Sequence, residues 1–392
     1  MHPPGADTVL VRHGDLNTKS NTVKRRMVNA LCENLEALLE DRSIPGRVEE
    51  GWNRPLVRTD ESHVEEAAET AADAFGVVST SPALSVTPEK QAILEALAET
   101  AEVHYDGGAF AIDARRANKN VPFTSHDIAT EGGTAVWEAV EDEFEPEVDL
   151  DEPDLSFGVE VRDEEAYVYV DRVDGPGGLP LGSQAPMVAM ISGGIDSPVA
   201  AYEAMKRGSP VIPVYVDLGD YGGIDHEARA METVRTLSRY ATDFDMRVYR
   251  VPGGDTVDLL VETMEEGRML SLRRFFYRAG EVIAERAGAY GIVTGEAVGQ
   301  KSSQTARNLA VTSRATDLPI HRPLLTRDKQ EIVAMAREIG TYTDSTIDAG
   351  CNRVAPDRAE TNARLERLLE IEPDDLLERA EEAATNAELV EP

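Results

Sequence analysis

The stretch Ser192-Gly193-Gly194-Ile195-Asp196-Ser197 decides the fold of this 392-residue chain, because it lies between a predicted strand and a predicted helix. The five apolar residues from Met187 to Ile191 precede it, as is typical of a buried parallel strand. Pro198 then opens a predicted helix that ends at Gly208, and proline is favoured at the start of a helix and glycine just past its end. Beyond this point strands alternate with helices, which predicts an α/β domain with a doubly wound parallel sheet.

The composition of the loop equips it to hold an oxyanion. Gly193 and Gly194 let the backbone approach a ligand closely. Ser192 and Ser197 add hydroxyl donors, and the helix N-terminus presents free N–H groups to a phosphate. Asp196 would repel that phosphate without a cation between them, so we expect a Mg²⁺ that bridges its carboxylate and a pyrophosphate. The alternative is a capped turn in which the glycines are needed only for the backbone conformation. The complete six-residue motif, placed between a strand and a helix, favours nucleotide binding instead.

The chain is strongly acidic, with 73 Asp and Glu residues, 39 Lys and Arg residues and a formal charge of -34. Its 41% hydrophobic content excludes a disordered acidic chain, and its length predicts two or three domains. We interpret the acidity as adaptation to a cytoplasm with molar salt, where screening permits a dense carboxylate surface.

Two absences restrict the class of protein further. No apolar run approaches the roughly 20 residues of a membrane span, and the start Met1-His2-Pro3-Pro4 has no signal-peptide pattern. A cytoplasmic protein without a membrane association is therefore expected. With only two cysteines, Cys32 and Cys351, one chain cannot assemble a disulfide framework or a four-cysteine zinc site. Cys32 falls in a helix predicted from about Lys24 to Glu40, where we expect it to pack in a core.

A basic turn stands out in the acidic amino-terminal half. It contains Arg115, Arg116 and Lys119. Guanidinium and ammonium groups suit phosphate oxygens, which predicts contact with an RNA backbone. The alternative is a solvated loop whose cations pair with neighbouring carboxylates.

With these motifs, the chain resembles the tRNA 4-thiouridine synthetases (ThiI), a branch of the PP-loop ATP pyrophosphatases, over nearly its whole length. The stretch from Thr8 to Leu16 resembles the opening of the family's ferredoxin-like domain. Phe75 to Pro82 and Phe110 to Lys119 resemble parts of its THUMP domain, which binds the acceptor end of tRNA, and Gly177 to Gln184 matches the family linker. The resemblance implies a ferredoxin-like domain over 1–63, a THUMP domain over 64–174 and a PP-loop ATP pyrophosphatase domain over 175–392.

A second motif, from Val293 to Thr305, follows a predicted strand and also matches the family. For Met190, Ile191 and Val216 the residues alone indicate core side chains, so their contacts with adenine would be made by the backbone. From the residues alone, Arg273 is an ordinary polar residue on a helix. Its role as a phosphate ligand is implied only by the resemblance to the family. The ATP contacts implied by the resemblance are Met190, Ile191, Ser192, Gly193, Gly194, Asp196, Ser197, Tyr215, Val216, Arg273, Gly295 and Gln304.

The family reaction implies that uridine 8 of tRNA is adenylated by ATP and that a sulfur nucleophile then expels AMP, giving 4-thiouridine. Mg²⁺ and Arg273 would offset charge on the phosphates. Cys351 aligns with the cysteine of the family's pyrophosphatase domain, so Asp196 and Cys351 are the predicted catalytic residues. From the residues alone, Cys351 could equally be a spare cysteine in a loop.

The pattern departs from the family at its end. Many relatives carry a C-terminal rhodanese domain with a second cysteine, whereas this sequence ends in a predicted acidic helix near Asp374 to Leu389. Either Cys351 takes sulfur from a separate donor, such as a cysteine desulfurase or another carrier, or free sulfide attacks the adenylate. A homodimer is compatible with the resemblance. Two further functions are a PP-loop enzyme acting on a small substrate, as in thiamine thiazole synthesis, and a non-catalytic tRNA-binding protein; the intact loop argues against the latter.

Overall fold

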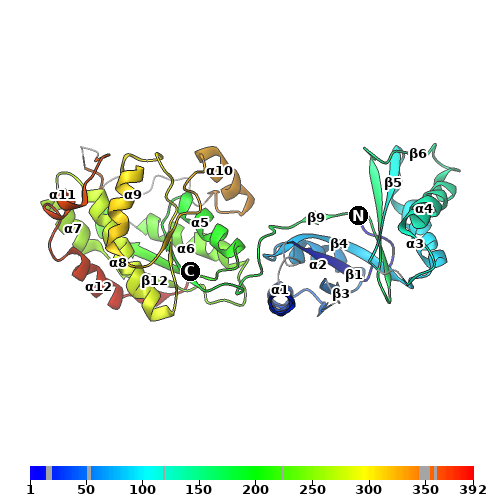
Figure 1. Ribbon diagram of the computed structural model, residues 1–392, viewed down its shortest axis with the longest axis horizontal. Coiled ribbons are helices and arrows are strands. Elements are labelled where there is room, and N and C mark those ends of the chain that lie inside the picture. The colour runs from blue at the N-terminus through cyan, green and yellow to red at the C-terminus, as the bar shows by residue number, and fades with distance from the viewer. Residues whose placement is uncertain (15–19, 51–53, 118–119, 223, 344–353, 357–359) are drawn as a thin grey trace. The chain divides into compact units, whose positions relative to one another are not determined.

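A computed structural model of the protein describes residues 1–14, 20–50, 54–117, 120–222, 224–343, 354–356 and 360–392. The chain forms two compact units, Met1–Pro180 and Leu181–Pro392 (Figure 1). Each unit has its own sheet and its own apolar core. The predicted fold class is confirmed, since an α+β unit precedes a unit with a largely parallel sheet. Across the described ranges, no helix is long and apolar enough to cross a membrane.

The first unit is built on one nine-stranded sheet in the order β2-β3-β1-β4-β8-β7-β5-β6, with β9 paired to β4. The long strand β4 pairs with β1 along one part and with β8 along another. The two halves of this unit therefore share a continuous sheet. Its strands are β1 (Thr8–His13), β2 (Arg47–Glu49), β3 (Leu56–Arg58), β4 (Val77–Val86), β5 (Ala109–Arg116), β6 (Glu147–Val148), β7 (Leu155–Val161), β8 (Ala166–Tyr169) and β9 (Val173–Asp174).

Two pairs of helices cover this sheet, each over its own half. The first pair packs on β1, β3 and β4, where Leu31, Leu35 and Leu38 follow the helical period along one buried face. The second pair packs on β5, β7 and β8 around Phe110 and Phe157. The helices are α1 (Asn21–Asp41), α2 (Val64–Ala72), α3 (Lys90–His104) and α4 (Ser125–Val140).

The sheet of the second unit runs in the order β14-β13-β10-β11-β12-β15 and is parallel except for β15. Chain order reverses at β10, since β11 and β12 follow on one side while β13 and β14 lie on the other. Folds of this type bind ligands in the crevice beyond the carboxyl ends of the strands at such a reversal. The strands are β10 (Met187–Ile191), β11 (Val211–Asp217), β12 (Val248–Pro252), β13 (Ile292–Val293), β14 (Ile320–His321) and β15 (Glu388–Val390).

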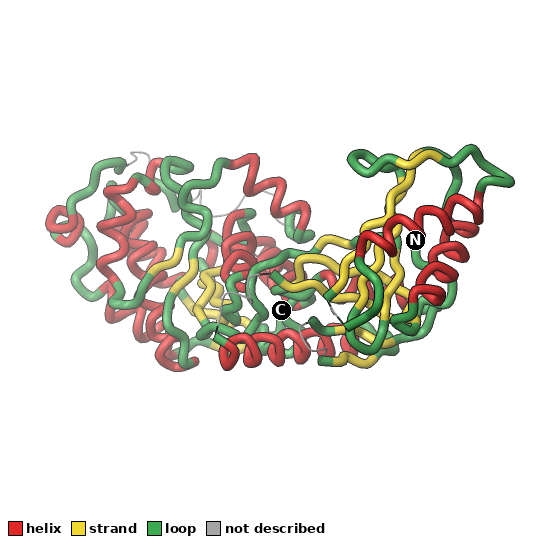
Figure 2. The backbone as a smooth tube through the Cα atoms, turned by 45° about the vertical axis from the view of Figure 1, so that its right-hand side comes forward, coloured by secondary structure: helices red, strands yellow, loops and turns green. Residues whose placement is uncertain are grey.

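Helices, red in Figure 2, surround this sheet. The core that contains Val188 also contains Leu272 and Phe275 of α8, while Ala189 and Ile191 on the opposite face of β10 are buried too. The helices are α5 (Asp196–Lys206), α6 (Ile224–Ser238), α7 (Gly254–Thr263), α8 (Arg268–Ala287), α9 (Ala306–Thr312), α10 (Lys329–Glu338), α11 (Leu365–Leu369) and α12 (Leu376–Thr385).

The end of the chain differs from the prediction of a helix up to about Leu389. α12 ends at Thr385, and β15 then pairs antiparallel with β12, with Leu389 opposite Tyr249. The free edge of β12 can form hydrogen bonds with an extended segment. This pairing depends on the tertiary structure, so the local helical propensity of the last residues does not predict it.

Candidate functional site

The loop between β10 and α5 closes on itself through its two serines. The Ser192 N–H donates to Ser197 Oγ at 3.0 Å, and the two hydroxyl oxygens lie 3.2 Å apart. The Gly194 N–H donates to Ser192 Oγ at 3.4 Å. α5 begins at Asp196 rather than at Pro198 as predicted, so the proline lies in the first turn, where its missing N–H breaks no helical hydrogen bond. The N-terminus of α5 thus follows directly on a compact loop, as an anion site requires.

Gly295 lies just beyond β13 and packs against the first residues of α5. A Cβ at this position would be 2.6 Å from the carbonyl carbon of Asp196 and 2.7 Å from the nitrogen of Ser197. These atoms belong to the backbone and cannot turn aside. Only a residue without a side chain therefore fits here, and the glycine holds the turn after β13 against the loop.

Replacing Gly295 by alanine is expected to push the loop away from β13. Overpacking of this kind destabilises proteins by about 1–3 kcal/mol. We expect a loss of that size in equilibrium unfolding, together with weaker ATP binding. The matched control is Gly133→Ala, because Gly133 lies in α4, where an added Cβ would meet no atom within 4 Å. Equal unfolding free energies for the two variants would contradict the role of Gly295 in holding the loop.

His226, in the first turn of α6, lies directly behind the loop and is 2% exposed. Its Nε2 accepts from the Gly193 N–H at 3.4 Å, and its Nδ1 lies 3.1 Å from the hydroxyl of Tyr215. A ring that accepts at Nε2 in this way is neutral. Burial, reinforced by the charge of Arg229, lowers the pKa of His226. The histidine therefore supports the loop as a neutral acceptor.

Because the folded-state pKa of His226 lies below the unfolded value near 6.5, the neutral ring favours folding. This contribution is fully present above the unfolded pKa and is lost as the pH falls through the folded pKa. We expect the unfolding free energy to decrease below about pH 6.5 and to do so less steeply in His226→Gln. Equilibrium unfolding from about pH 8 to about pH 5 tests this, and identical slopes for the two proteins would remove His226 as the cause.

The Asp196 carboxylate accepts hydrogen bonds from two side chains. Lys329 Nζ lies 2.7 Å from Oδ1, and Gln300 Nε2 lies 3.1 Å from Oδ2. Lys329 is the first residue of α10, whose start is held by a capping box between Asp328 and Glu331. A cation is thus placed beside the carboxylate by a helix far away in the sequence.

A buried carboxylate, Glu296, organises the other side of the site. Its Oε2 accepts from Arg322 Nε at 2.8 Å and from Thr294 Oγ1 at 3.1 Å, and Tyr277 also donates to it. Its Oε1 lies 3.3 Å from Arg273 Nε. Burial and the neighbouring carboxylate raise the pKa of Tyr277. Glu296 therefore holds Arg273 and Arg322 in place and offsets part of their charge.

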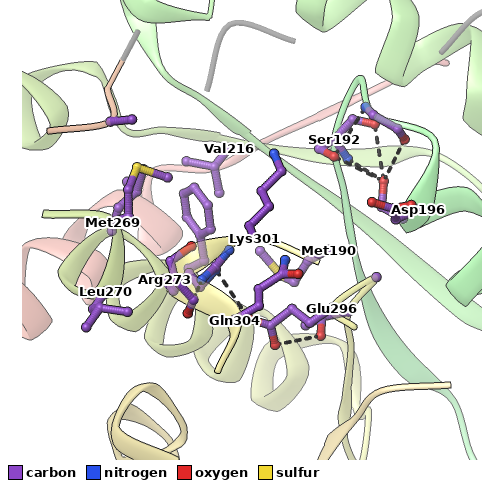
Figure 3. A pocket seen from close by; sticks show the side chains of 18 of the residues that line it. Met190, Ser192, Asp196, Val216, Met269, Leu270, Arg273, Glu296, Lys301 and Gln304 are labelled. Atoms are coloured by element: carbon purple, nitrogen blue, oxygen red, sulfur yellow. Dashed lines mark hydrogen bonds and ion pairs between the residues drawn. The ribbon is translucent and has the colours of Figure 1, made fainter. Parts of the chain in front are cut away.

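These groups surround a cavity of about 540 Å³ at the carboxyl ends of the strands. Figure 3 shows the Ser192 and Asp196 end opposite Met269 and Leu270, with Arg273, Glu296 and Gln304 along one wall. Gly193 and Tyr215 are absent from the lining and instead contact His226 behind the loop. The predicted ATP residues that line the cavity are Met190, Ile191, Ser192, Gly194, Asp196, Ser197, Val216, Arg273, Gly295 and Gln304.

The predicted RNA residues lie at the end of β5 in the first unit. Arg115 is exposed and its Nη2 lies 3.2 Å from Asp113 Oδ2. Arg116 donates to the carbonyls of Val121 and Phe123, so it also shapes the turn that follows. Lys119 lies outside the described residues. The RNA contact of these residues stays a prediction.

Cys351 also lies outside the described residues, but the chain shortly after it belongs to the cavity. Val354 is fully buried, and its carbonyl accepts from Arg268 Nη1 at 3.1 Å. Ala355 and Pro356 line the cavity. Cys351 is three residues before Val354, and each residue of a fully extended chain spans at most about 3.6 Å. The Cα atoms of Cys351 and Val354 can therefore be at most roughly 11 Å apart.

Sequence reasoning missed several residues of the site. Glu296 and Lys301 lie inside the second motif, within which the resemblance implied contacts for Gly295 and Gln304 alone. Lys329 is one of seven lysines in the chain, and this scarcity is a usable signal. His226 has no such signal, because its contact with the loop arises from the packing of α6 alone.

Known families match three stretches of the chain. The ThiI ferredoxin-like domain matches residues 8–81, the THUMP domain matches 89–171 and the thiamine biosynthesis protein ThiI matches 182–376. The chain is 57% identical over 391 residues to a "Probable tRNA sulfurtransferase" of Halobacterium salinarum, covering 100% of this chain and 99% of that protein. A protein with the same name from Methanosarcina acetivorans is 39% identical, covering 93% and 88% respectively.

Solved structures are also similar to the chain. The crystal structure of a 4-thiouridine synthetase and RNA complex with bound ATP matches with a TM-score of 0.85 and 30% identity, over 98% of this chain and 100% of that one. The crystal structure of PH1313 from Pyrococcus horikoshii matches in fold, with a TM-score of 0.67 and 23% identity over 85% of this chain and 99% of that one.

Proposed function

The chain belongs to the ThiI family of tRNA sulfurtransferases and is a sulfur-transferring enzyme, and on this premise we propose that it uses ATP to replace O4 of uridine 8 in tRNA with sulfur. The observation that carries the proposal is the Ser192–Ser197 loop at the end of β10, which borders the cavity. The ATP-bound synthetase that matches nearly the whole chain supports ATP as the cosubstrate.

In the proposed first step, the uracil O4 attacks the α-phosphate of ATP. A P–O bond forms, the anhydride bond to the β-phosphate breaks, and pyrophosphate leaves. The N-terminus of α5, which no side chain among the described residues caps, would stabilise the negative charge on the phosphates. Arg273 and Lys329 add positive charge nearby, each already oriented by a carboxylate, Glu296 and Asp196 respectively. In the second step a sulfur nucleophile adds to C4, and AMP leaves with the original oxygen.

Magnesium fits this site only together with the nucleotide. Among the described residues there is no group of three His, Cys, Asp or Glu side chains that could hold a metal ion. A Mg²⁺ would therefore be held by the single carboxylate of Asp196 and by phosphate oxygens, as is usual for this ion. Bound in that way, it would supply charge neutralisation at the leaving pyrophosphate.

We assign the sulfur step to Cys351. Cys351 precedes Val354 by only three residues, and the next residues, Ala355 and Pro356, line the cavity. This short separation along the chain supports a position of Cys351 within reach of the cavity. A cysteine desulfurase or another carrier would transfer the sulfur to Cys351 as a persulfide, whose outer sulfur attacks C4; an external thiol would then cleave the disulfide that links Cys351 to the base. The alternative is that free sulfide attacks the adenylate directly, without Cys351. The other cysteine, Cys32, is poorly suited, because burial and nearby glutamates raise the pKa of its thiol to about 11.

We assign tRNA binding to the first unit, where the THUMP domain matches. The acceptor end and the region of uridine 8 are the proposed contacts, with Arg115, Arg116 and Lys119 meeting phosphates. The RNA complex of the similar synthetase supports this assignment. The target base must leave its stacked position to enter the cavity of the second unit.

The test is whether pyrophosphate release from ATP requires tRNA. We expect release only with unmodified tRNA present, followed by 4-thiouridine in that tRNA when a sulfur source is added. Release that is independent of tRNA and requires a small substrate would contradict the proposal. That outcome would favour a role in thiamine thiazole synthesis, with which the match of the second unit to a thiamine biosynthesis protein is consistent.

A further inference from the structure

Resting on the proposed function, we propose that Lys301 is the residue that binds the β- and γ-phosphates of ATP through its ammonium group. Within the part of the chain that the structure describes, no contact engages this ammonium group. Lys301 lines the cavity and is exposed, and Figure 3 shows its side chain extending between the Ser192 and Asp196 end and the wall that carries Arg273.

The other cation of the lining is already engaged. Arg273 Nη1 donates to the Ser303 carbonyl at 2.9 Å, and its Nε lies 3.3 Å from Glu296 Oε1. The Gln304 side-chain amide satisfies its neighbours when its nitrogen faces the Ala297 carbonyl and its oxygen faces Arg273. In this orientation the amide oxygen accepts from Arg273 Nη2 at 3.2 Å. All three guanidinium nitrogens of Arg273 thus face protein oxygens. Lys329, nearby, is paired with Asp196.

Lys301 has no such partner among the described residues. Of the three carboxylates that line the cavity, Asp196 pairs with Lys329 and Glu296 with Arg273. Glu360 Oε1 accepts from the Asn362 N–H instead. In a chain with a formal charge of -34 and only seven lysines, an ammonium group in a cavity that pairs with no described carboxylate indicates an anionic ligand.

The backbone of Lys301 is nevertheless well placed. Its carbonyl accepts from the Gln304 N–H at 2.8 Å, and the Gly299 N–H donates to the Gln304 carbonyl at 3.0 Å. The buried Asn308 donates to the Ser302 carbonyl at 3.3 Å. A firm backbone and a free, long side chain suit a contact that forms only when the ligand enters. The loop is expected to hold the pyrophosphate part of ATP, and Lys301 extends beside it in the same cavity, so its ammonium group would meet the β- and γ-phosphates.

In the molar salt that the acidic composition predicts, a phosphate must be contacted directly. At about 1 M salt the Debye length is about 3 Å, so an exposed cation attracts a phosphate only at hydrogen-bonding distance. A point charge with three rotatable donors can follow the phosphates through the bond-breaking step, which a planar guanidinium held by three oxygens cannot do as readily. Lys301 would therefore distinguish ATP and pyrophosphate from AMP.

The experiment measures binding of ATP, inorganic pyrophosphate and AMP by calorimetry to the full chain, to Lys301→Met and to Lys301→Arg. A charge-assisted hydrogen bond corresponds to roughly tenfold or more in affinity. We expect Lys301→Met to lose about this factor for ATP and pyrophosphate while AMP binding is unchanged, and Lys301→Arg to retain most of it. The matched control is Lys206→Met, since Lys206 lies in the same unit at the far end of α5 from the loop.

Equal affinities of the wild type and Lys301→Met for ATP would overturn the inference and leave the proposed function intact. An AMP affinity that falls as much as the ATP affinity would also overturn it, because the lysine would then act at the base or ribose end or through the fold. A wild-type chain that binds none of the three ligands would overturn the proposed function and the inference together.

Discussion

Replacing Asp196 by alanine is expected to abolish 4-thiouridine formation. The carboxylate is the acceptor of both Lys329 and Gln300, and its loss leaves both side chains without the group that orients them. It also removes the protein ligand proposed for Mg²⁺. Losses of a single group at a preorganised charged site reach about 10²–10³-fold in turnover, and we expect at least this effect. The near-ultraviolet absorbance of 4-thiouridine in tRNA after reaction is the measurement.

Two further variants separate charge from shape in this prediction. Asp196→Asn keeps the shape of the side chain and the Gln300 contact but removes the charge, so we expect it to be as inactive as Asp196→Ala. Asp258→Asn removes an exposed carboxylate of α7 in the same unit and should behave as the wild type. Unchanged absorbance in Asp196→Ala would refute the assignment of the loop.

Cys351→Ser is expected to separate the two steps of the reaction. The loop, Arg273 and Lys329 remain in this variant, so tRNA-dependent pyrophosphate release should persist. Formation of 4-thiouridine should fall below detection, because a hydroxyl group cannot carry sulfur to the activated base. Mass spectrometry of the wild type after incubation with a sulfur donor should locate a persulfide on Cys351.

The control for this prediction is Cys32→Ser. Cys32 packs beside Met27 and Val28 on α1, and its raised pKa, about 11, keeps it a protonated thiol at neutral pH. We expect this variant to form 4-thiouridine at the wild-type rate. Full thiolation by Cys351→Ser with sulfide as the only sulfur source would instead show that free sulfide attacks the adenylate, and the catalytic assignment of Cys351 would be wrong.

Much of the site was predictable because the chemistry is concentrated in two short motifs. The Ser192–Ser197 loop and the Val293–Thr305 segment each follow a strand, and ten of the twelve predicted ATP residues line one cavity. Local sequence can specify this much, since the carboxyl ends of parallel strands meet at one edge of the sheet. The terminal strand β15 was not predictable, because its hydrogen bonds depend on the free edge of β12.

By itself, the sequence determined the fold class, the position of the Ser192–Ser197 loop between a strand and a helix, and the membership of the family. These properties depend on local pattern, in which a buried strand, two glycines and a helix start follow one another within a few residues. Only the tertiary structure decided which charges face which. It placed Lys329 on Asp196, Glu296 on Arg273 and His226 behind Gly193. Such pairings join residues from separate helices and strands, and the energy of an ion pair or a buried hydrogen bond depends on distance and burial, which only packing sets.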